Sequence, residues 1–359
     1  MEKKDSIWKE HDSVSGEEVK RRKTENIYIE EISNGNHLEN LVQQNSPVNN
    51  ALIRDSKIND LYCDWSIAAP ELNEVKVREK KGRMTPVYTL CSFTYDESID
   101  FEKINKRGMF NITAYDRRVY NAIGTLWLSG RRTFSLTEIV DVMNGYRKTK
   151  PSAKQLQSVE KALHKLKNVN LHIDLTAEVK AHMLKDKQPL IDAGILKDSK
   201  DDVKSVVIED SMLRYRMMTI TSKNGKQFKT IQIMSEPSLL TYNRAKGTLL
   251  TIPMEYIRLS STNATEKVLA FQDYLLMRII NYQNGYMNES KVLYDTLYKD
   301  SGIEKPSVAK DFKRDRDIIK KMLDEWKNQE LIEGYSDIKK GRSYIGFKFK
   351  VKEAEESEL

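Results

Sequence analysis

Three consecutive segments in the first half of the chain carry apolar residues at helical spacing. The first, residues 114–128 (AYDRRVYNAIGTLWL), is amphipathic, and Gly130 follows it as a helix breaker. Ser135 and Glu138 have the spacing of a capping box, which predicts that a second helix begins there and stops at Gly145. The pattern therefore predicts two helices before the third segment.

The third segment, residues 153–167, has two faces of different character. Ser152 and Gln155 form another capping box behind Pro151, which places the first helical residue near Ala153. Apolar residues at helical spacing predict the buried face, and they are Leu156, Val159, Ala162, Leu163 and Leu166. The opposite face carries Lys154, Ser158, Lys161 and Lys165.

Alternating and β-branched runs follow the third helix. Residues 170–175 and 204–209 are predicted strands, and residues 213–222 and 227–234 are joined through an Asn-Gly turn that predicts a β-hairpin. An apolar run at 86–94 is expected to add a strand to the same module. Three helices and then a hairpin is the order of a winged helix, a helix-turn-helix variant whose third helix enters the major groove of DNA.

The same order recurs near the C-terminus. Residues 265–282, 291–299 and 307–329 are predicted helices, and residues 331–335 and 344–351 are predicted strands around a basic turn. In the third of these helices the apolar stripe is predicted to comprise Val308, Phe312, Ile319, Met322, Leu323 and Trp326. The expected fold class is α+β and helix-rich, with two winged-helix domains in tandem and a flexible N-terminal tail.

Charge is concentrated on the two third helices. Residues 145–167 hold seven Lys/Arg and one acid, whereas residues 306–350 hold twelve Lys/Arg and eight Asp/Glu. Such an excess on a short helix suits a polyanion. The candidate DNA-binding residues are Arg147, Lys148, Lys150, Lys154, Ser158, Lys161, Lys165, Lys310, Lys313, Arg314, Lys321, Lys340 and Arg342.

Residues 84–351 resemble the tandem winged-helix replication initiators of plasmids and related mobile elements, which bind repeated origin sequences called iterons. The resemblance rests on the element order and on phrases such as AYDRRVYNAIGTLWLSG, VLYDTLYKDSG and DFKRDRDIIKKMLDEWKNQELIEGY. It implies that both third helices and hairpins contact DNA, and that the chain switches between a homodimer and a monomer. An insertion at residues 176–203 departs from the family pattern.

The composition shift along the chain predicts its domain organisation. We expect residues 84–240 to form the first domain, with the insertion inside it, and residues 241–351 to form the second. Residues 1–83 are polar and mixed in charge, which predicts a largely disordered tail, although two short apolar runs interrupt it. Residues 352–359 (KEAEESEL) form an acidic C-terminal tail.

Overall composition is consistent with an anionic partner. The 359 residues carry a formal net charge of +7, with a pI near 9.0. No run of 18 apolar residues and no apolar signal-peptide core appear, so a cytoplasmic protein without a membrane span is expected. Cys63 and Cys91 lack the spacing of a metal site, and no metal or cofactor is expected.

The sequence lacks the common motifs of replication enzymes. It has no glycine-rich loop ending in GK[ST] and no His-hydrophobe-His triplet beside a tyrosine nucleophile. Tyr115 and Tyr120 are expected in the core or an interface rather than in catalysis. Acid pairs such as Asp315 and Asp317 are expected to be solvated rather than to hold Mg²⁺. We therefore expect no enzymatic activity and no catalytic residue.

The order and charge of these elements predict a protein that binds double-stranded DNA, and the resemblance implies that it binds specific sequences and initiates replication of a plasmid or mobile element. It would bind repeated origin sites, promote local duplex opening and recruit a host initiator, helicase or helicase loader. Two alternatives remain open. One is a transcriptional repressor or partition protein that binds a palindromic operator, and the other is a tandem winged-helix subunit that binds other proteins.

Overall fold

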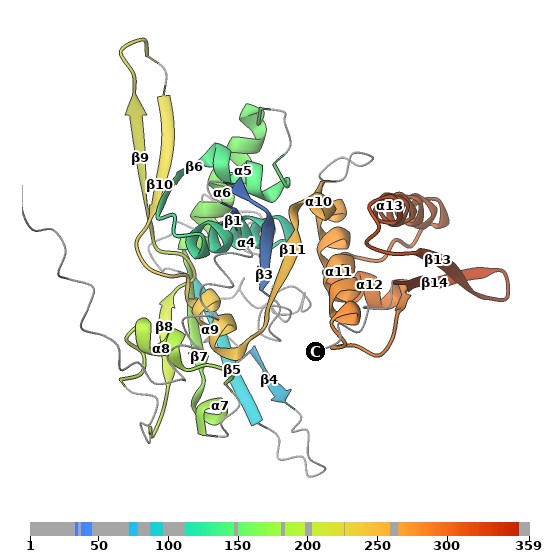
Figure 1. The fold of residues 1–359 in the computed structure, drawn as a ribbon, viewed down its shortest axis with the longest axis horizontal. Coiled ribbons are helices and arrows are strands. Elements are labelled where there is room, and N and C mark those ends of the chain that lie inside the picture. Colours follow the sequence, from blue (N-terminus) through green and yellow to red (C-terminus); the bar gives the residue numbers. More distant parts are fainter. Residues whose placement is uncertain are drawn as a thin grey trace, which may run out of the picture.

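The computed structural model describes residues 33–34, 37–44, 72–77, 87–95, 112–146, 150–180, 184–197, 203–225, 227–258 and 265–351. They form a mixed α+β fold that is rich in helix, with small antiparallel sheets (Figure 1). The helices are α4 (Ala114–Leu128), α5 (Leu136–Met143), α6 (Ala153–Lys167), α7 (Thr176–Lys180), α8 (Gln188–Asp192), α9 (Ser238–Lys246), α10 (Met254–Ile257), α11 (Glu266–Gln283), α12 (Tyr294–Ser301) and α13 (Ala309–Asn328).

The strands of the described residues lie in five sheets. They are β1 (Ser33–Asn34), β2 (His37–Leu38), β3 (Asn40–Gln44), β4 (Leu72–Val77), β5 (Val87–Tyr95), β6 (Thr133–Ser135), β7 (Val169–Asp174), β8 (Val207–Ser211), β9 (Tyr215–Thr221), β10 (Gln227–Ile233), β11 (Leu249–Pro253), β12 (Lys291–Leu293), β13 (Gly334–Lys340) and β14 (Ser343–Lys350). The strand orders are β1-β2, β6-β10-β9, β11-β3, β12-β14-β13 and β4-β5-β7-β8.

Helices α5 and α6 begin where the capping boxes predict, and α4 spans the residues of the first predicted helix. Ser135 and Ser152 each accept a hydrogen bond from the backbone three residues later, and the Glu138 and Gln155 side chains reach back to the cap. The predicted apolar stripe of α6 packs inward, with Val159, Leu163 and Leu166 fully buried and Leu156 partly buried. The three predicted helices and their boundaries are therefore confirmed.

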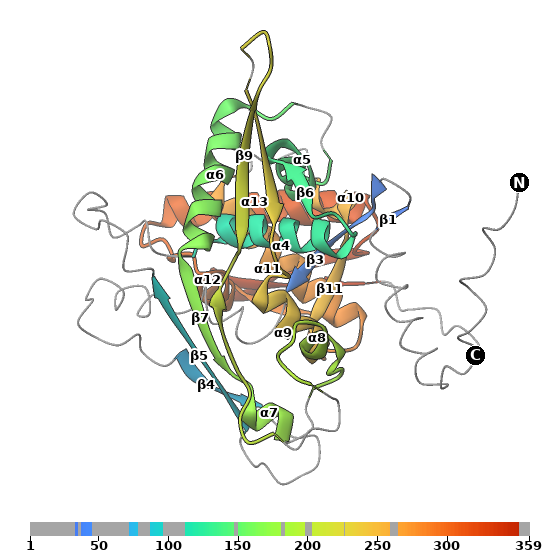
Figure 2. The ribbon, with the colours of Figure 1, turned by 90° about the vertical axis from the view of Figure 1, so that its left-hand side faces the viewer.

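The predicted hairpin forms a three-stranded sheet with a strand from between α4 and α5. Strand β10 pairs with β9 over the whole hairpin, and its other edge pairs with β6 through Thr230, Ile231 and Gln232 only. Beyond that short overlap the hairpin continues alone and projects from the body of the molecule in both ribbon views (Figures 1 and 2).

Residues 169–211 build a second sheet that the sequence did not separate from the hairpin. Strand β7 pairs with β5 on one side and with β8 on the other, so the apolar run at 86–94 does contribute a strand beside the helices. The insertion at 176–203 includes α7 and α8, which lie between β7 and β8 in the chain. Strands β7 and β8 thus belong to a separate sheet and not to the sheet of the hairpin.

Part of the N-terminal segment is built into the core, so the expectation of disorder is wrong for residues 37–44. Strand β3 pairs with β11 in antiparallel register, and Leu38, Leu41 and Val42 are buried. The backbone N–H of Val42 also donates to Thr125 Oγ1 of α4 at 2.9 Å. A five-residue strand between polar stretches has too short an apolar pattern to predict, and only its partners reveal it.

The C-terminal group repeats the order of helix, strand, helix, helix and hairpin. Residues 291–293, predicted as the start of a helix, form strand β12 instead, because Lys291 and Val292 pair with β14. Helix α13 buries Ile319, Met322, Leu323 and Trp326 as predicted. Val308, assigned to the same stripe, is exposed because it occupies the N-cap position, before the first helical residue Ala309.

Candidate nucleic-acid interface

The face of α6 opposite its buried stripe is exposed and carries mainly basic and amide groups. Lys154 and Lys161 on α6 are exposed, as is Lys150 just before the helix. Ser158 is partly buried, and its hydroxyl donates to the carbonyl of Lys154 at 2.9 Å, one turn earlier. Lys154 and Lys161 of the predicted face are therefore accessible, whereas Ser158 is accessible only in part.

Lys165 was assigned to this face, but it is occupied elsewhere. Its ammonium lies 2.5 Å from Asp116 Oδ2 on α4, with the lysine side chain 17% and the aspartate side chain 5% exposed. Asp116 also caps its own helix by accepting from the backbone N–H of Thr113. Lys165 thus joins α6 to α4, and a helical projection of α6 alone does not reveal this role.

The single acid of α6 faces the hairpin. Glu160 accepts from Lys229 of β10, with Nζ–Oε distances of 2.6 and 2.7 Å. Lys167 lies with its ammonium 5.6 Å from the centre of the Tyr215 ring on β9. Burial and the nearby Glu160 carboxylate raise the pKa of Tyr215 to about 12, so that ring stays neutral at physiological pH. These contacts hold the hairpin against the helix.

Helix α13 presents a second basic face. Lys310, Lys313, Arg314 and Lys321 are all exposed, with Asp317 exposed among them. Arg314 contacts Asp311 on the same helix at 3.3 Å, and because both side chains lie largely in solvent this pair is weak. The acids in and beside this face make the second module less basic than the first.

The hairpin that follows α13 is attached through Tyr344. Arg316 of α13 stacks 3.8 Å from the centre of the Tyr344 ring, and Lys339 of β13 lies 4.7 Å from it. Lys320 of α13 lies 2.7 Å from the Asp337 carboxylate of β13. The predicted contact residues of the turn, Lys340 and Arg342, are exposed at its end.

The two acids considered for a metal site lie in different surroundings, and Asp317 is exposed as expected. Asp315 is buried rather than solvated, and it accepts from Lys267 and from the Tyr298 hydroxyl at 3.0 and 2.9 Å. Across the described residues no group of three or more His, Cys, Asp or Glu side chains could hold a metal ion. Within the same residues no helix is long and apolar enough to cross a membrane.

Several accessible groups near the two helices were missed in the sequence. Gln157 lies one turn from Lys154 and Lys161 on the exposed face of α6. Lys223 is exposed in the turn of the first hairpin, and Val308 at the start of α13 is 55% exposed. The sequence signal that could have identified Lys223 and Val308 is their position in a hairpin turn or at a helix end. Two predicted residues, Arg147 and Lys148, lie outside the described residues.

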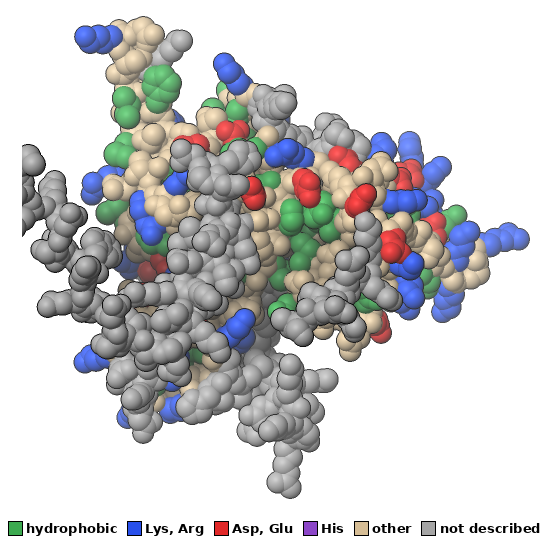
Figure 3. Space-filling view, viewed as in Figure 1, with side chains coloured by type: hydrophobic (Ala, Val, Ile, Leu, Met, Phe, Trp, Pro, Cys, Tyr) green, Lys and Arg blue, Asp and Glu red, His purple; other side chains and the backbone are tan. Residues whose placement is uncertain are grey.

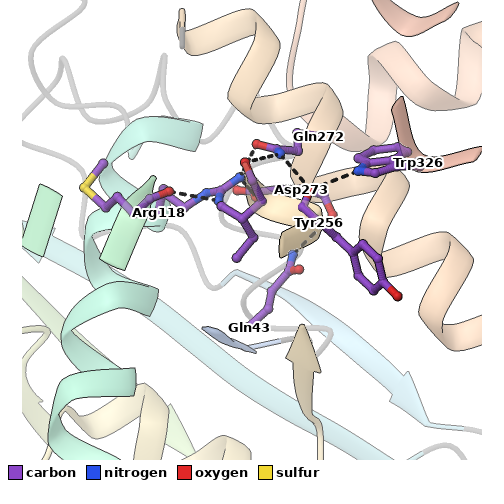
Figure 4. Close-up of polar contacts among 8 residues, drawn as sticks. Gln43, Arg118, Tyr256, Gln272, Asp273 and Trp326 are labelled. Atoms are coloured by element: carbon purple, nitrogen blue, oxygen red, sulfur yellow. Dashed lines mark hydrogen bonds and ion pairs between the residues drawn. The ribbon is translucent and has the colours of Figure 1, made fainter. Parts of the chain in front are cut away.

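A buried polar network joins the first helical group, α4 to α6, to the second, α11 to α13. Arg118 of α4, with a fully buried side chain, lies 2.5 Å from Asp273 Oδ1 and donates to Gln272 Oε1 at 2.8 Å on α11. It also donates to the carbonyl of Met143 at 3.3 Å. Figure 4 shows Arg118 reaching these groups, while Gln43 of β3 approaches from another side. This ion pair, with the packing of α11 against α4, fixes one group to the other.

The same network continues to the third helix of the second group. Gln272 donates through Nε2 to the carbonyl of Ile257 at 2.9 Å, and Trp326 Nε1 of α13 donates to the carbonyl of Tyr256 at 2.9 Å (Figure 4). Helix α10 is therefore held between α11 and α13. The position of α13 relative to α4 depends on these buried contacts rather than on a flexible linker.

No protein-family model matches the chain, and no curated protein matches it. The chain is similar to two crystal structures of domains 2 and 3 of RctB. They are 12% and 9% identical to it, each with a TM-score of 0.39, and the matches cover 78% of this chain and 94% and 90% of those chains.

Proposed function

We propose that this chain binds double-stranded DNA through two winged-helix modules, with α6 and α13 as the helices that enter the major groove. The observation that carries the proposal is the exposed face of α6, where Lys154 and Lys161 are accessible, with Lys150 exposed just before the helix. The one acid of the helix, Glu160, pairs with Lys229 of the hairpin. Such a face favours the binding of a phosphate-rich partner, and the affinity then depends on the salt concentration.

The proposed contacts fall into two classes. Lysines along α6 and α13, with Lys340 and Arg342 in the second hairpin, bind phosphates and set the register of the protein on the duplex. Gln157 and Ser158, in the middle of α6, carry side chains that form directional hydrogen bonds and are proposed to read base edges; a glutamine pairs well with adenine. Arg147 and Lys148 remain predicted contacts of the segment before α6.

We further propose that the DNA site is a set of repeated sequences at a replication origin, and that binding promotes opening of the adjacent duplex and recruitment of host replication proteins. The support for this step is the resemblance of residues 84–351 to plasmid initiators. The protein would act in the cytoplasm, as a monomer or homodimer, and without its own catalytic site or cofactor.

The two alternatives predict different DNA footprints. A repressor or partition protein protects one palindrome, whereas an initiator protects several direct repeats beside an A·T-rich segment. A protein-interaction subunit protects no DNA. The exposed basic face of α6 favours the DNA-binding alternatives over the interaction subunit.

The test is DNase footprinting of the purified protein on fragments from its own genetic neighbourhood, at about 150 mM salt because affinity depends on salt. We expect a regularly spaced ladder of protected repeats. We expect Lys161→Glu, by weakening binding roughly tenfold or more, to remove this ladder at the protein concentration at which the wild type protects it. Lys180→Glu is the matched control, because Lys180 is also exposed but lies on α7, away from the proposed helices (Figure 2). Protection that survives Lys161→Glu and is lost with Lys180→Glu would refute the assignment of α6.

A further inference from the structure

The outer face of the β9–β10 hairpin carries two large apolar side chains that contact solvent. Ile220 is 56% exposed and Phe228 is 54% exposed, and the two residues are direct cross-strand partners. The next pair toward the body on the same face is Met218 with Thr230, and both of these are only partly buried. The face is therefore apolar near the tip of the hairpin.

This pair lies on the free part of the hairpin. The β6 edge stops at Thr230, so Ile220 and Phe228 lie beyond the last strand that supports β10. On the opposite face Lys229 is tied to Glu160 of α6. Because side chains alternate across a strand, the helix fixes one face and leaves the other directed outward. Figure 3 shows hydrophobic side chains on this projecting arm, with a basic tip.

The charge around the pair indicates a polyanionic partner rather than a second copy of this chain. Residues 215–233 contain four Lys/Arg and no acid, so two such hairpins would repel each other. The exposed apolar area of two side chains of this size is on the order of 200 Å². A stable protein interface needs about 800 Å² per partner, which this pair does not supply.

We propose that Ile220 and Phe228 form an apolar wedge that inserts between base steps of the DNA minor groove next to the segment bound by α6. The inference rests on the proposed DNA binding and specifies what the first hairpin does there. Lys223 in the turn and Arg216 on the same face of β9 would bind the flanking phosphates. Apolar wedges of this kind partly unstack a step and kink the duplex by about 20–90°.

The wedge links binding to opening. Unstacking a base step costs less energy where stacking is weak, so insertion favours flexible pyrimidine–purine steps. The DNA is then deformed beside the bound site. The duplex bend would then come from the hairpin, whereas the affinity would come mainly from the lysines of α6. These two properties are separable by mutation.

The experiment compares wild type with the variant Ile220→Thr/Phe228→Thr, which keeps β-forming residues on exposed positions and so preserves the hairpin. The control is Tyr286→Thr, because Tyr286 is 73% exposed in the turn after α11. The probe is a duplex of about 40 base pairs carrying the protected sequence, longer than the 20–30 base pairs over which a bend is usually spread. Dyes at its two ends report bending by energy transfer, and a gel shift reports affinity.

We expect wild type and Tyr286→Thr to bend the duplex equally, and the double variant to remain bound with less than half of that bend. Equal bending by the double variant, or binding of wild type without a bend, would overturn the wedge while leaving DNA binding intact. A double variant that changes oligomeric state on gel filtration, with its bend unaltered, would show the pair to be a protein contact. If wild type binds no DNA, the proposed function fails and the wedge fails with it.

Discussion

The buried ion pair between Arg118 and Asp273 gives the sharpest test of how the two helical groups are held together. Arg118 is fully buried and the Asp273 side chain is 3% exposed, so neither charge is solvated in the folded protein. Replacing Asp273 by Asn keeps the shape of the side chain and removes its charge. The guanidinium of Arg118 then remains in the core without a counter-charge.

The expected cost follows from that geometry. Breaking a buried pair by removing one partner destabilises a protein by about 3–5 kcal/mol, because an uncompensated buried charge is left behind. Arg118 keeps its hydrogen bonds to Gln272 and to the carbonyl of Met143. We therefore expect a loss near the lower end, about 3 kcal/mol, and a fall in Tm of roughly 10 °C at 2–4 °C per kcal/mol.

Urea unfolding followed by tryptophan fluorescence measures this loss, since Trp326 is buried beside the network. The control is Asp295→Asn, whose pair with Lys305 is exposed and worth less than about 1 kcal/mol. The double variant Arg118→Met/Asp273→Leu removes both charges and should recover much of the stability. A loss below 1 kcal/mol for Asp273→Asn, or a double variant no more stable than Asp273→Asn, would refute the reasoning.

Three further predictions concern single positions. Lys165→Gln should lower the free energy of unfolding, measured in urea, by about 1–2 kcal/mol, because a partly buried ion pair is lost. Lys161→Glu should leave the free energy of unfolding unchanged but weaken DNA binding roughly tenfold or more in a gel shift. Gly346→Ala should destabilise by roughly 1–3 kcal/mol in urea, because its Cβ would lie 2.3 Å from a carbonyl oxygen of β12, while Gly334→Ala has open space and should not. Burial raises the pKa of the Glu236 carboxyl in the folded protein. The protonated carboxyl therefore contributes its full stability below the pKa of the unfolded chain, and this contribution is lost as pH rises through the folded-state pKa. Urea unfolding between about pH 4 and pH 8 should show wild type losing stability relative to Glu236→Gln.

The local signals of the sequence predicted the helices well because capping is a local interaction. Ser135 and Ser152 satisfy backbone groups three residues away, so their helix starts do not depend on the rest of the fold. The Asn-Gly turn of the first hairpin is local in the same sense. Helix α12 began three residues late because Val292 pairs with distant β14, which no local pattern contains.

The candidate interface was predictable only as far as exposure follows from helical periodicity. Lys154 and Lys161 are exposed as the α6 pattern indicates, whereas Lys165 meets Asp116 from 49 residues away in the chain. Arg118 reads in the sequence as one more surface charge on an amphipathic helix, yet its partner is 155 residues further on. Long-range pairing of charges is the information that one sequence does not provide.

The buried network bears directly on how two DNA-binding helices would act together. Two modules on a flexible linker gain affinity from each other according to the linker's length, and they tolerate many spacings between half-sites. Here Arg118 and Asp273 fix α4 to α11, and Trp326 fixes α13 to the same core. If α6 and α13 both bind one duplex, their separation is therefore set by the core, and a site with altered spacing must be bent to fit. Bending by the first hairpin and rigidity of the core would then serve the same end, because a stiff two-module body converts binding energy into deformation of the DNA between its contacts.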